Sequence, residues 1–260
     1  MIKKINLSKY ILISFVSLTY LFLYIPMIVL IIFSFNNSTS TFKWNGFTLS
    51  WYQELFNSSQ IWSVLENSLI IALVSVFLCL AISLLAIWCL MNKKYKLFNY
   101  FSLIVLIPEI AIAVALLTIF TFFNVPLGLN TLIVGHTLLG LGFAFPIIYN
   151  AFQDINKLLI EASLDLGASI RQTFFYVIMP ILFPAFFSAA LLVFILSIDD
   201  FLISFFCAGP ESQTLSLYIF AMIRGGLSPV INALSTIILI FSSACVLLYS
   251  FFNIKSNLKN

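Results

Sequence analysis

Five stretches of this chain run for more than 20 residues without an Asp, Glu, Lys or Arg side chain. A helix crosses the roughly 30 Å core of a lipid bilayer with about 20 apolar residues, at roughly 1.5 Å per residue. A sixth apolar stretch, 97–124, is interrupted only by Glu109. The sequence therefore predicts an all-α, polytopic membrane protein with six transmembrane helices. The five uncharged stretches are 11–35, 67–91, 125–153, 172–198 and 225–254.

The small number of charged residues excludes most classes of soluble protein. Only 8% of the residues are charged and 62% are hydrophobic, whereas roughly 25% are charged in a typical soluble domain. A soluble domain needs polar side chains to cover its surface. The composition therefore excludes a soluble enzyme or a nucleic-acid-binding protein, and it makes the lipid bilayer the expected surrounding of the chain.

The positions of the basic residues predict which loops face the cytoplasm. Loops beside membrane spans carry more Lys and Arg on the cytoplasmic side. If both termini are cytoplasmic, only Lys43 and Arg224 of the 12 basic residues lie outside. We therefore expect a multi-pass protein of the cytoplasmic membrane with both termini in the cytoplasm. The basic residues on the inner side are then Lys3, Lys4, Lys9, Lys93, Lys94, Lys96, Lys157, Arg171, Lys255 and Lys259.

The sequence lacks the residues that catalysis or metal binding would need. His136 is the one histidine, and it lies in an apolar stretch beside Gly135. Such a histidine is expected to bond a neighbouring helix or a backbone carbonyl more often than to relay protons or bind a substrate. Gly135 and Gly140 have the spacing of P-loop glycines but lack the Lys and Ser/Thr that follow them. The sequence therefore predicts no catalytic residue, no metal site and no ATP hydrolysis by that route.

The segment 154–171 differs from a short basic loop because it carries three acids, two bases and a helical pattern. At about 100° per residue, its polar and apolar residues lie on separate sides of a helix, and Gly167 interrupts the pattern. From the pattern alone, a helix that merely lies in the headgroup region is the favoured interpretation. The polar side contains Asp154, Lys157, Glu161 and Asp165, and the apolar side contains Ile155, Leu159, Ala162 and Leu166.

The same segment contains a longer signature. The residues E-A-S at 161–163 are followed after three residues by Gly167 and, after nine more, by V-I-M-P at 177–180. This arrangement resembles the EAA signature of binding-protein-dependent ABC importer permeases, which reads E-A-A, x3, G, x9, I-x-L-P. The spacing agrees throughout, and the departures are Ser for the second Ala, Val for Ile and Met for Leu.

The resemblance implies that the whole chain, 1–260, is one permease domain with the type I ABC importer fold. The segment 154–171 would then be a coupling-helix loop that docks on a separate ATPase subunit, and Pro180 would open the next span. ATP and magnesium would bind to that partner, so this chain would hold no cofactor. The residues expected at the contact are Glu161, Ala162, Ser163, Asp165 and Gly167.

Other parts of the chain resemble the spermidine/putrescine permeases of this family. They are K-W-N-G-F-T at 43–48, S-I-D-D-F at 197–201, C-A-G-P at 207–210 and S-P-x2-N-A-L at 228–234. The resemblance implies a bacterial inner-membrane complex with a second, related permease, two ATPase subunits and an extracytoplasmic polyamine-binding protein.

Three acids lie within the predicted spans, where an ionised side chain costs at least about 2.5 to 3.5 kcal/mol. Glu109 is expected near the middle of its span, and Asp199 and Asp200 lie toward the outer part of the fifth. A cationic substrate would supply their missing partner, and Trp44 could stack on it by a cation–π contact. Protonated acids that bond between helices and an interfacial aromatic belt are the alternative interpretations.

The sequence therefore favours the permease subunit of an ATP-driven polyamine importer. One alternative is a permease of the same kind for another cargo, such as thiamine, iron, sulfate or phosphate. Another is a proton-coupled secondary transporter that uses Glu109 or the Asp199–Asp200 pair as its relay. A third is a membrane scaffold that transports nothing.

Overall fold

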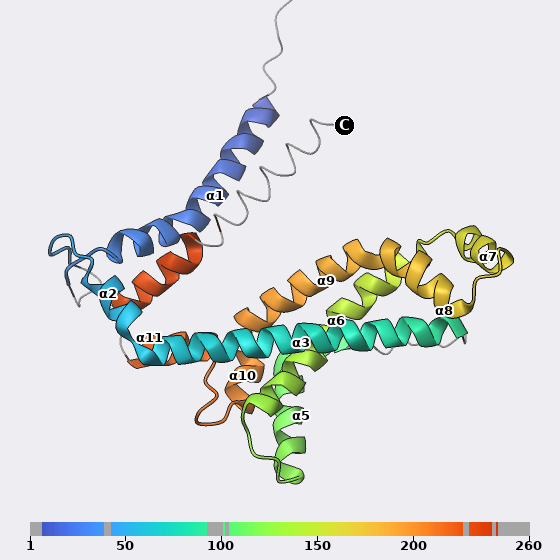
Figure 1. Ribbon diagram of the computed structural model, residues 1–260. Coiled ribbons are helices and arrows are strands. Elements are labelled where there is room, and N and C mark those ends of the chain that lie inside the picture. Colours follow the sequence, from blue (N-terminus) through green and yellow to red (C-terminus); the bar gives the residue numbers. More distant parts are fainter. Residues whose placement is uncertain are drawn as a thin grey trace, which may run out of the picture. The chain divides into compact units, whose positions relative to one another are not determined.

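The computed structural model of the protein describes residues 7–38, 43–92, 101, 104–225, 229–240 and 243, and the regular elements named within them are helices (Figure 1). Most of the predicted span 225–254, the start of the stretch 97–124, and Lys93, Lys94 and Lys96 lie outside these residues. The helices are α1 (Leu7–Phe33), α2 (Ser50–Asn57), α3 (Ser59–Asn92), α5 (Glu109–Phe122), α6 (Leu129–Gln153), α7 (Lys157–Asp165), α8 (Ile170–Thr173), η1 (Phe174–Ile178), α9 (Met179–Asp199), α10 (Leu202–Cys207) and α11 (Leu215–Gly225).

Four helical stretches among the described residues are long and apolar enough to cross a membrane, and each overlaps one of the predicted uncharged stretches. A helix pairs every backbone N–H and C=O internally, which is why apolar segments adopt it in lipid. The shorter apolar helices Glu109–Phe122 and Pro229–Ile240 lie within the two remaining predicted stretches. The predicted all-helical membrane architecture is confirmed. The four long stretches are Leu12–Phe33, Ser59–Cys89, Leu129–Gln153 and Ile170–Asp199.

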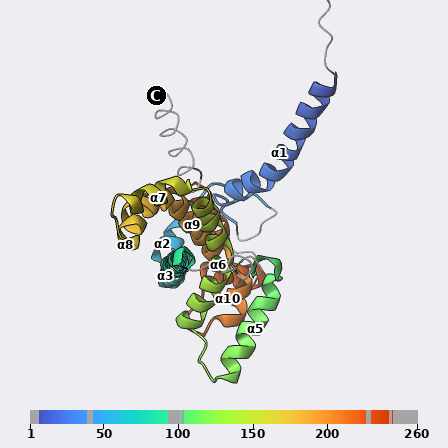
Figure 2. The same ribbon diagram turned by 90° about the vertical axis from the view of Figure 1, so that its right-hand side faces the viewer.

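The chain forms two compact units, one made of residues 1–59 and 219–260 and the other of residues 60–218. In the second unit, α6 is the central helix, because 61% of its apolar span is buried against 33% for α3 and 22% for the stretch that contains α9. Figures 1 and 2 both show α6 and α9 side by side, with α10 beside α5. The conformations of α6, α9 and α10 therefore decide where the functional side chains of this unit lie.

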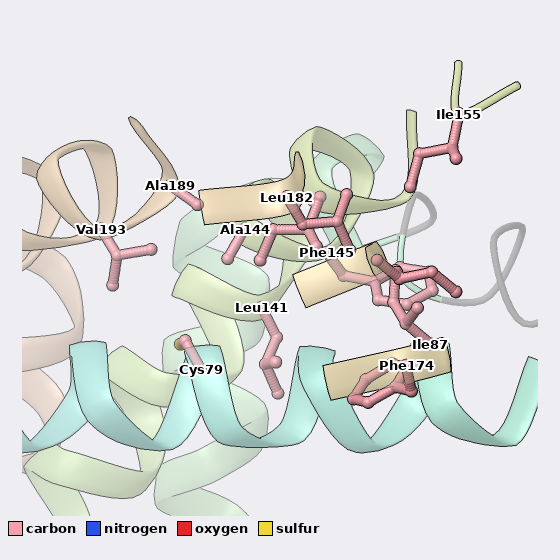
Figure 3. Close-up of a cluster of buried hydrophobic side chains, with 12 residues drawn as sticks. Cys79, Ile87, Leu141, Ala144, Phe145, Ile155, Phe174, Leu182, Ala189 and Val193 are labelled. Atoms are coloured by element: carbon pink, nitrogen blue, oxygen red, sulfur yellow. The ribbon is translucent and has the colours of Figure 1, made fainter. Parts of the chain in front are cut away.

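Two buried clusters hold the second unit together. The first joins α3, α6, η1 and α9, and Figure 3 shows Cys79 and Ile87 of α3, Phe145 of α6 and Phe174 of η1 among its side chains. The second joins α3, α5, α6 and α10 around Leu132 and other apolar side chains. Since α6 contributes to both clusters, it connects the two halves of this unit.

Two glycines allow α6 to approach its neighbours closely. A Cβ atom on Gly140 would lie 2.8 Å from Cγ1 of Val193 in α9 and 2.9 Å from Sγ of Cys79 in α3. A Cβ on Gly135 would lie 2.5 Å from Cγ2 of Ile203 in α10. Carbon atoms pack at about 3.5 to 4.0 Å, so a larger residue at either position would push these helices apart.

We expect Gly140→Ala to destabilise the protein by about 1 to 3 kcal/mol, the usual effect of an added methyl group in a close-packed core. The measurement is the thermal midpoint of the purified protein in detergent. Adding Val193→Ala should recover part of the loss, because it removes one of the two close contacts. Gly225→Ala is the control, since no atom in the described part of the chain lies within 4 Å of its added Cβ. An unchanged midpoint for Gly140→Ala would contradict the close approach of α6 and α9.

Candidate functional site

The described part of the stretch 97–124 is not a continuous helix. A bend at Ile107 and Pro108 separates a short helical segment at 104–106 from α5, whose first residue is Glu109. The residue before a proline is disfavoured in the helical region, which explains the interruption. Glu109 therefore lies in the first turn of α5, where the helix dipole favours a negative charge.

A second interruption separates α9 from α10 and contains the two aspartates. Asp199 is the last residue of α9, and Asp200 has an extended backbone with φ −62° and ψ 124°. The Asp200 carboxylate accepts hydrogen bonds from the backbone N–H groups of Ile203 at 3.3 Å and Ser204 at 2.9 Å, at the start of α10. Asp200 is buried, whereas Asp199 is exposed. The two adjacent acids therefore have different surroundings.

His136 of α6 lies against this second interruption. Its Nδ1 atom is 2.7 Å from Oγ of Ser197, and its Nε2 atom is 3.4 Å from Oδ2 of Asp200. Oγ of Ser204 lies 3.4 Å from the same Nε2 and donates to Asp200 Oδ2 at 3.2 Å. The expectation that His136 bonds a neighbouring helix is confirmed. All four side chains are at most 7% exposed, so water competes little for these hydrogen bonds.

Three acids from two separate parts of the sequence line one cavity of about 240 Å³. We call it the acidic cavity. Glu109 and Asp200 are also close enough for their carboxyl groups to interact directly. Among the described residues that line the cavity, three are acidic and none is basic. The arrangement suits a cation rather than an anion. The lining residues are Glu109, Leu139, Leu196, Asp199, Asp200, Phe201 and Leu202.

The sequence singled out the three acids of this cavity but not the serines that organise it. Ser197 and Ser204 lie three residues before and four after Asp200. In a continuous helix that spacing would place Ser197, Asp200 and Ser204 on one face. This spacing is the sequence signal that could have identified the two serines. Within the described residues, no three His, Cys, Asp or Glu side chains are grouped so that they could hold a metal ion.

Trp44 belongs to the other compact unit, and Asn36 fixes the backbone on both sides of it. The buried Asn36 side chain donates from Nδ2 to the Lys43 carbonyl at 2.8 Å and accepts from the Asn45 N–H at 2.8 Å. The Trp44 ring is 50% exposed and lies edge-on to Phe33, with 6.4 Å between ring centroids. The structure thus holds an exposed indole ring in a defined loop.

The main helix of the segment 154–171 is α7, which is shorter than the pattern predicts. Asn156 caps it by accepting from the Leu158 N–H at 3.0 Å. Asp154 and Ile155 precede it, and Ile155 joins the first buried cluster instead. No residue of α7 is buried, and Glu161, Ala162 and Asp165 are exposed. The predicted apolar side is therefore divided between the core and the surface.

The turn after α7 leads back toward the membrane span. Gly167 has φ +88°, a conformation that side chains with a Cβ rarely adopt. Beside it, Leu166 is 89% exposed. Oγ of Ser163 in α7 lies 3.0 Å from Oγ1 of Thr173 in α8, which fixes the angle of the turn.

Pro180 lies in the first turn of α9, within a longer helical stretch. The apolar helical stretch starts at Ile170, and the π-helical turn η1 comes immediately before α9, in which Pro180 is the second residue. A proline ring clashes with the carbonyl four residues earlier in a regular helix. A π turn widens the helix at this point, so the chain can contain Pro180 without ending the helix.

The sequence profile of one protein family, described as binding-protein-dependent transport system inner membrane component, matches residues 82–254. This match covers more than half of the chain. The chain belongs to this family. As a binding-protein-dependent transport component, it is part of a multi-pass membrane transporter rather than an enzyme.

Individual proteins agree with this assignment. The chain is 33% identical over 238 residues to the spermidine/putrescine transport system permease protein PotC of Escherichia coli (strain K12), covering 90% of each chain. It is 31% identical over 248 residues to the PotC protein of Haemophilus influenzae, covering 94% of this chain and 96% of that protein.

A solved structure has the same fold. It is the crystal structure of a bacterial ABC transporter involved in the import of the acidic polysaccharide alginate, with a TM-score of 0.71 and 14% identity. The similarity covers 97% of this inner membrane component and 98% of the solved chain. The predicted ABC importer permease fold is confirmed.

Proposed function

We propose that this chain is the permease subunit of an ATP-driven importer of polyamines such as spermidine and putrescine. The observation that carries the proposal is the acidic cavity, which brings Glu109 and Asp199 to one place without a basic residue in its described lining. Protonated amines are compact, strongly hydrated cations, and carboxylates can replace their water. The PotC proteins that the chain resembles are named for the same cargo.

Within the cavity, Glu109 and Asp199 are the acids assigned to the cation. Asp200 lines the same cavity, but its oxygens already accept hydrogen bonds from α10. A site of two carboxylates binds one ammonium group of a flexible polyamine weakly enough to release it. Trp44 is assigned to an early contact with the substrate, because its exposed ring can lie over methylene or ammonium groups.

The driving force comes from partner subunits. In this proposal ATP and its magnesium ion bind to two ATPase subunits of the PotA type, and this chain holds no cofactor. The exposed helix α7 and the turn at Gly167 dock on one of them, with Glu161, Ala162, Ser163 and Asp165 at the contact. A second permease of the PotB type completes the pathway, and a PotD-type binding protein delivers the polyamine.

The proposed orientation follows from the basic residues. With both termini in the cytoplasm of a bacterial cell, α7 faces the ATPases and the 43–48 segment faces the binding protein. Ten of the 12 basic residues then lie on the cytoplasmic side of the inner membrane, as the positive-inside rule requires.

The test is transport by the complete complex in liposomes. Uptake of labelled putrescine or spermidine should require ATP, the ATPase subunits and the loaded binding protein. Thiamine, iron and sulfate, added in excess, should not compete. Polyamine uptake by this chain alone, driven by a pH gradient, would instead establish a proton-coupled secondary transporter and overturn the proposal.

A further inference from the structure

We propose that His136 is a positioning residue for transport: it holds the Asp200 carboxylate across the interruption between α9 and α10, beside Glu109 and Asp199, the two acids assigned to the cation. This inference rests on the proposed function. It adds a role for a buried residue of α6 that the sequence resemblance does not include.

The Asp200 carboxylate is surrounded by donors. Oδ1 accepts from the Ile203 N–H at 3.3 Å, and Oδ2 accepts from the N–H and Oγ of Ser204 at 2.9 and 3.2 Å. His136 Nε2 faces the same Oδ2 at 3.4 Å. Two carboxylate oxygens offer about four acceptor positions, so Asp200 has little capacity left for a substrate. The backbone carbonyl of Asp200 also accepts from Oγ of Ser216.

Ser197 determines which nitrogen of His136 faces Asp200. Ser197 Oγ lies 2.7 Å from Nδ1, and its hydroxyl can donate to that nitrogen. The ring proton is then on Nε2, which lies 3.4 Å from Ser204 Oγ and 3.4 Å from Asp200 Oδ2. Because His136 and Asp200 are 2% and 6% exposed, solvent cannot replace this partner without opening the structure.

Loss of the Nε2 donor would alter the acidic cavity. Asp200 lies beside Glu109 and lines the cavity with Asp199. A carboxylate that loses a buried donor turns toward another source of positive charge or water. Asp200 already lines the acidic cavity, so its carboxylate can turn into that space. Asp200 would then compete with the two cation-binding acids and change both the shape and the charge of the site.

Two substitutions of His136 distinguish a role in positioning Asp200 from a role in packing alone. The side-chain amide of His136→Gln can reach the position of Nε2 and keep a donor on Asp200, whereas His136→Asn reaches only the position of Nδ1. In the reconstituted complete transporter with saturating loaded binding protein, we expect His136→Asn to reduce polyamine uptake about tenfold, as for one buried hydrogen bond to a charged group. His136→Gln should recover at least about half of the native rate.

ATP hydrolysis in the same preparation supplies the readout that a packing defect would not give. We expect His136→Asn to keep hydrolysis within about twofold of native while uptake falls, because the ATPase contact is unchanged. Thr137→Val is the matched control: Thr137 is buried on the same helix, and its Oγ1 has no hydrogen-bond partner in the described part of the chain. Its uptake should remain close to native.

The effect must also depend on Asp200. On an Asp200→Asn background, His136→Asn should change uptake by less than about twofold, since the pair acts as one unit. Should His136→Asn fail to assemble, Ser197→Ala replaces it: the imidazole stays but loses its orienting partner, and uptake should fall about threefold with hydrolysis preserved.

Three results would overturn the inference: equal uptake by His136→Asn and His136→Gln, a parallel loss of hydrolysis and uptake, or full additivity with Asp200→Asn. The proposed function fails on a different result. If Glu109→Gln and Asp199→Asn both leave polyamine uptake intact, the acidic cavity does not carry the cation, whatever the His136 variants show.

Discussion

The double substitution Glu109→Gln with Asp199→Asn is expected to reduce polyamine uptake by about a hundredfold. Each amide keeps the size of the side chain and removes the charge. A hydrogen bond to a charged group contributes about 1.5 to 3 kcal/mol, and each 1.4 kcal/mol corresponds to about tenfold. Each single substitution should therefore reduce uptake about tenfold. The measurement is the initial uptake of labelled spermidine per assembled complex at saturating loaded binding protein.

The matched control is Glu66→Gln, which neutralises an exposed acid of α3 that does not line the acidic cavity. Its uptake should stay within about twofold of native. Complex assembly and ATP hydrolysis should also be retained in the double variant, because both residues lie far along the chain from α7. Native uptake by the double variant, or an equal loss with Glu66→Gln, would show that the cavity is not the cation site.

The second large effect is expected at the turn after α7. Gly167→Val should abolish uptake and release the ATPase subunits during purification. Gly167 has φ +88°, and a β-branched residue in that region is strained. The chain would leave α7 in another direction, and the contact between Ser163 and Thr173 at 3.0 Å would be lost. Co-purification of the ATPase with the permease measures this directly.

Gly167→Asn is the comparison, because asparagine tolerates the left-handed conformation far better than valine. No atom of the described residues lies within 4 Å of a Cβ at this position, so neither side chain meets a steric obstacle in that part of the chain. We expect Gly167→Asn to retain most of the ATPase and most of the uptake. Equal behaviour of the two variants would mean that the backbone conformation at Gly167 does not control docking.

The long helices could be predicted from the sequence because lipid imposes a simple requirement. Uncharged stretches such as 125–153 and 172–198 become helices since no other backbone conformation satisfies their polar groups there. The three acids of the site were also recognisable, since charged residues in such stretches are expensive. The pattern of the segment 154–171 predicted a helix there, although α7 covers only Lys157–Asp165.

The two helix interruptions were harder to foresee. Pro108 gave a local signal for the first. The second lies between Asp199 and Leu202, where no proline or glycine interrupts the apolar pattern. Tertiary hydrogen bonds stabilise it: Asp200 caps α10, and Ser216 donates to its carbonyl. The contact between His136 and Asp200 joins residues far apart in the sequence, and no periodicity could reveal such a pairing.

The arrangement of α6 and α9 has a mechanical consequence. The chain between these two helices contains α7, α8 and η1, and away from that connection α6 and α9 carry His136 and Ser197, which bond each other. The distance from His136 to the end of α6 is roughly 25 Å at about 1.5 Å per residue. Close-packed interiors are stiff and transmit strain. A displacement of the α7 end of these two packed helices is therefore transmitted to the carboxylates near their other end.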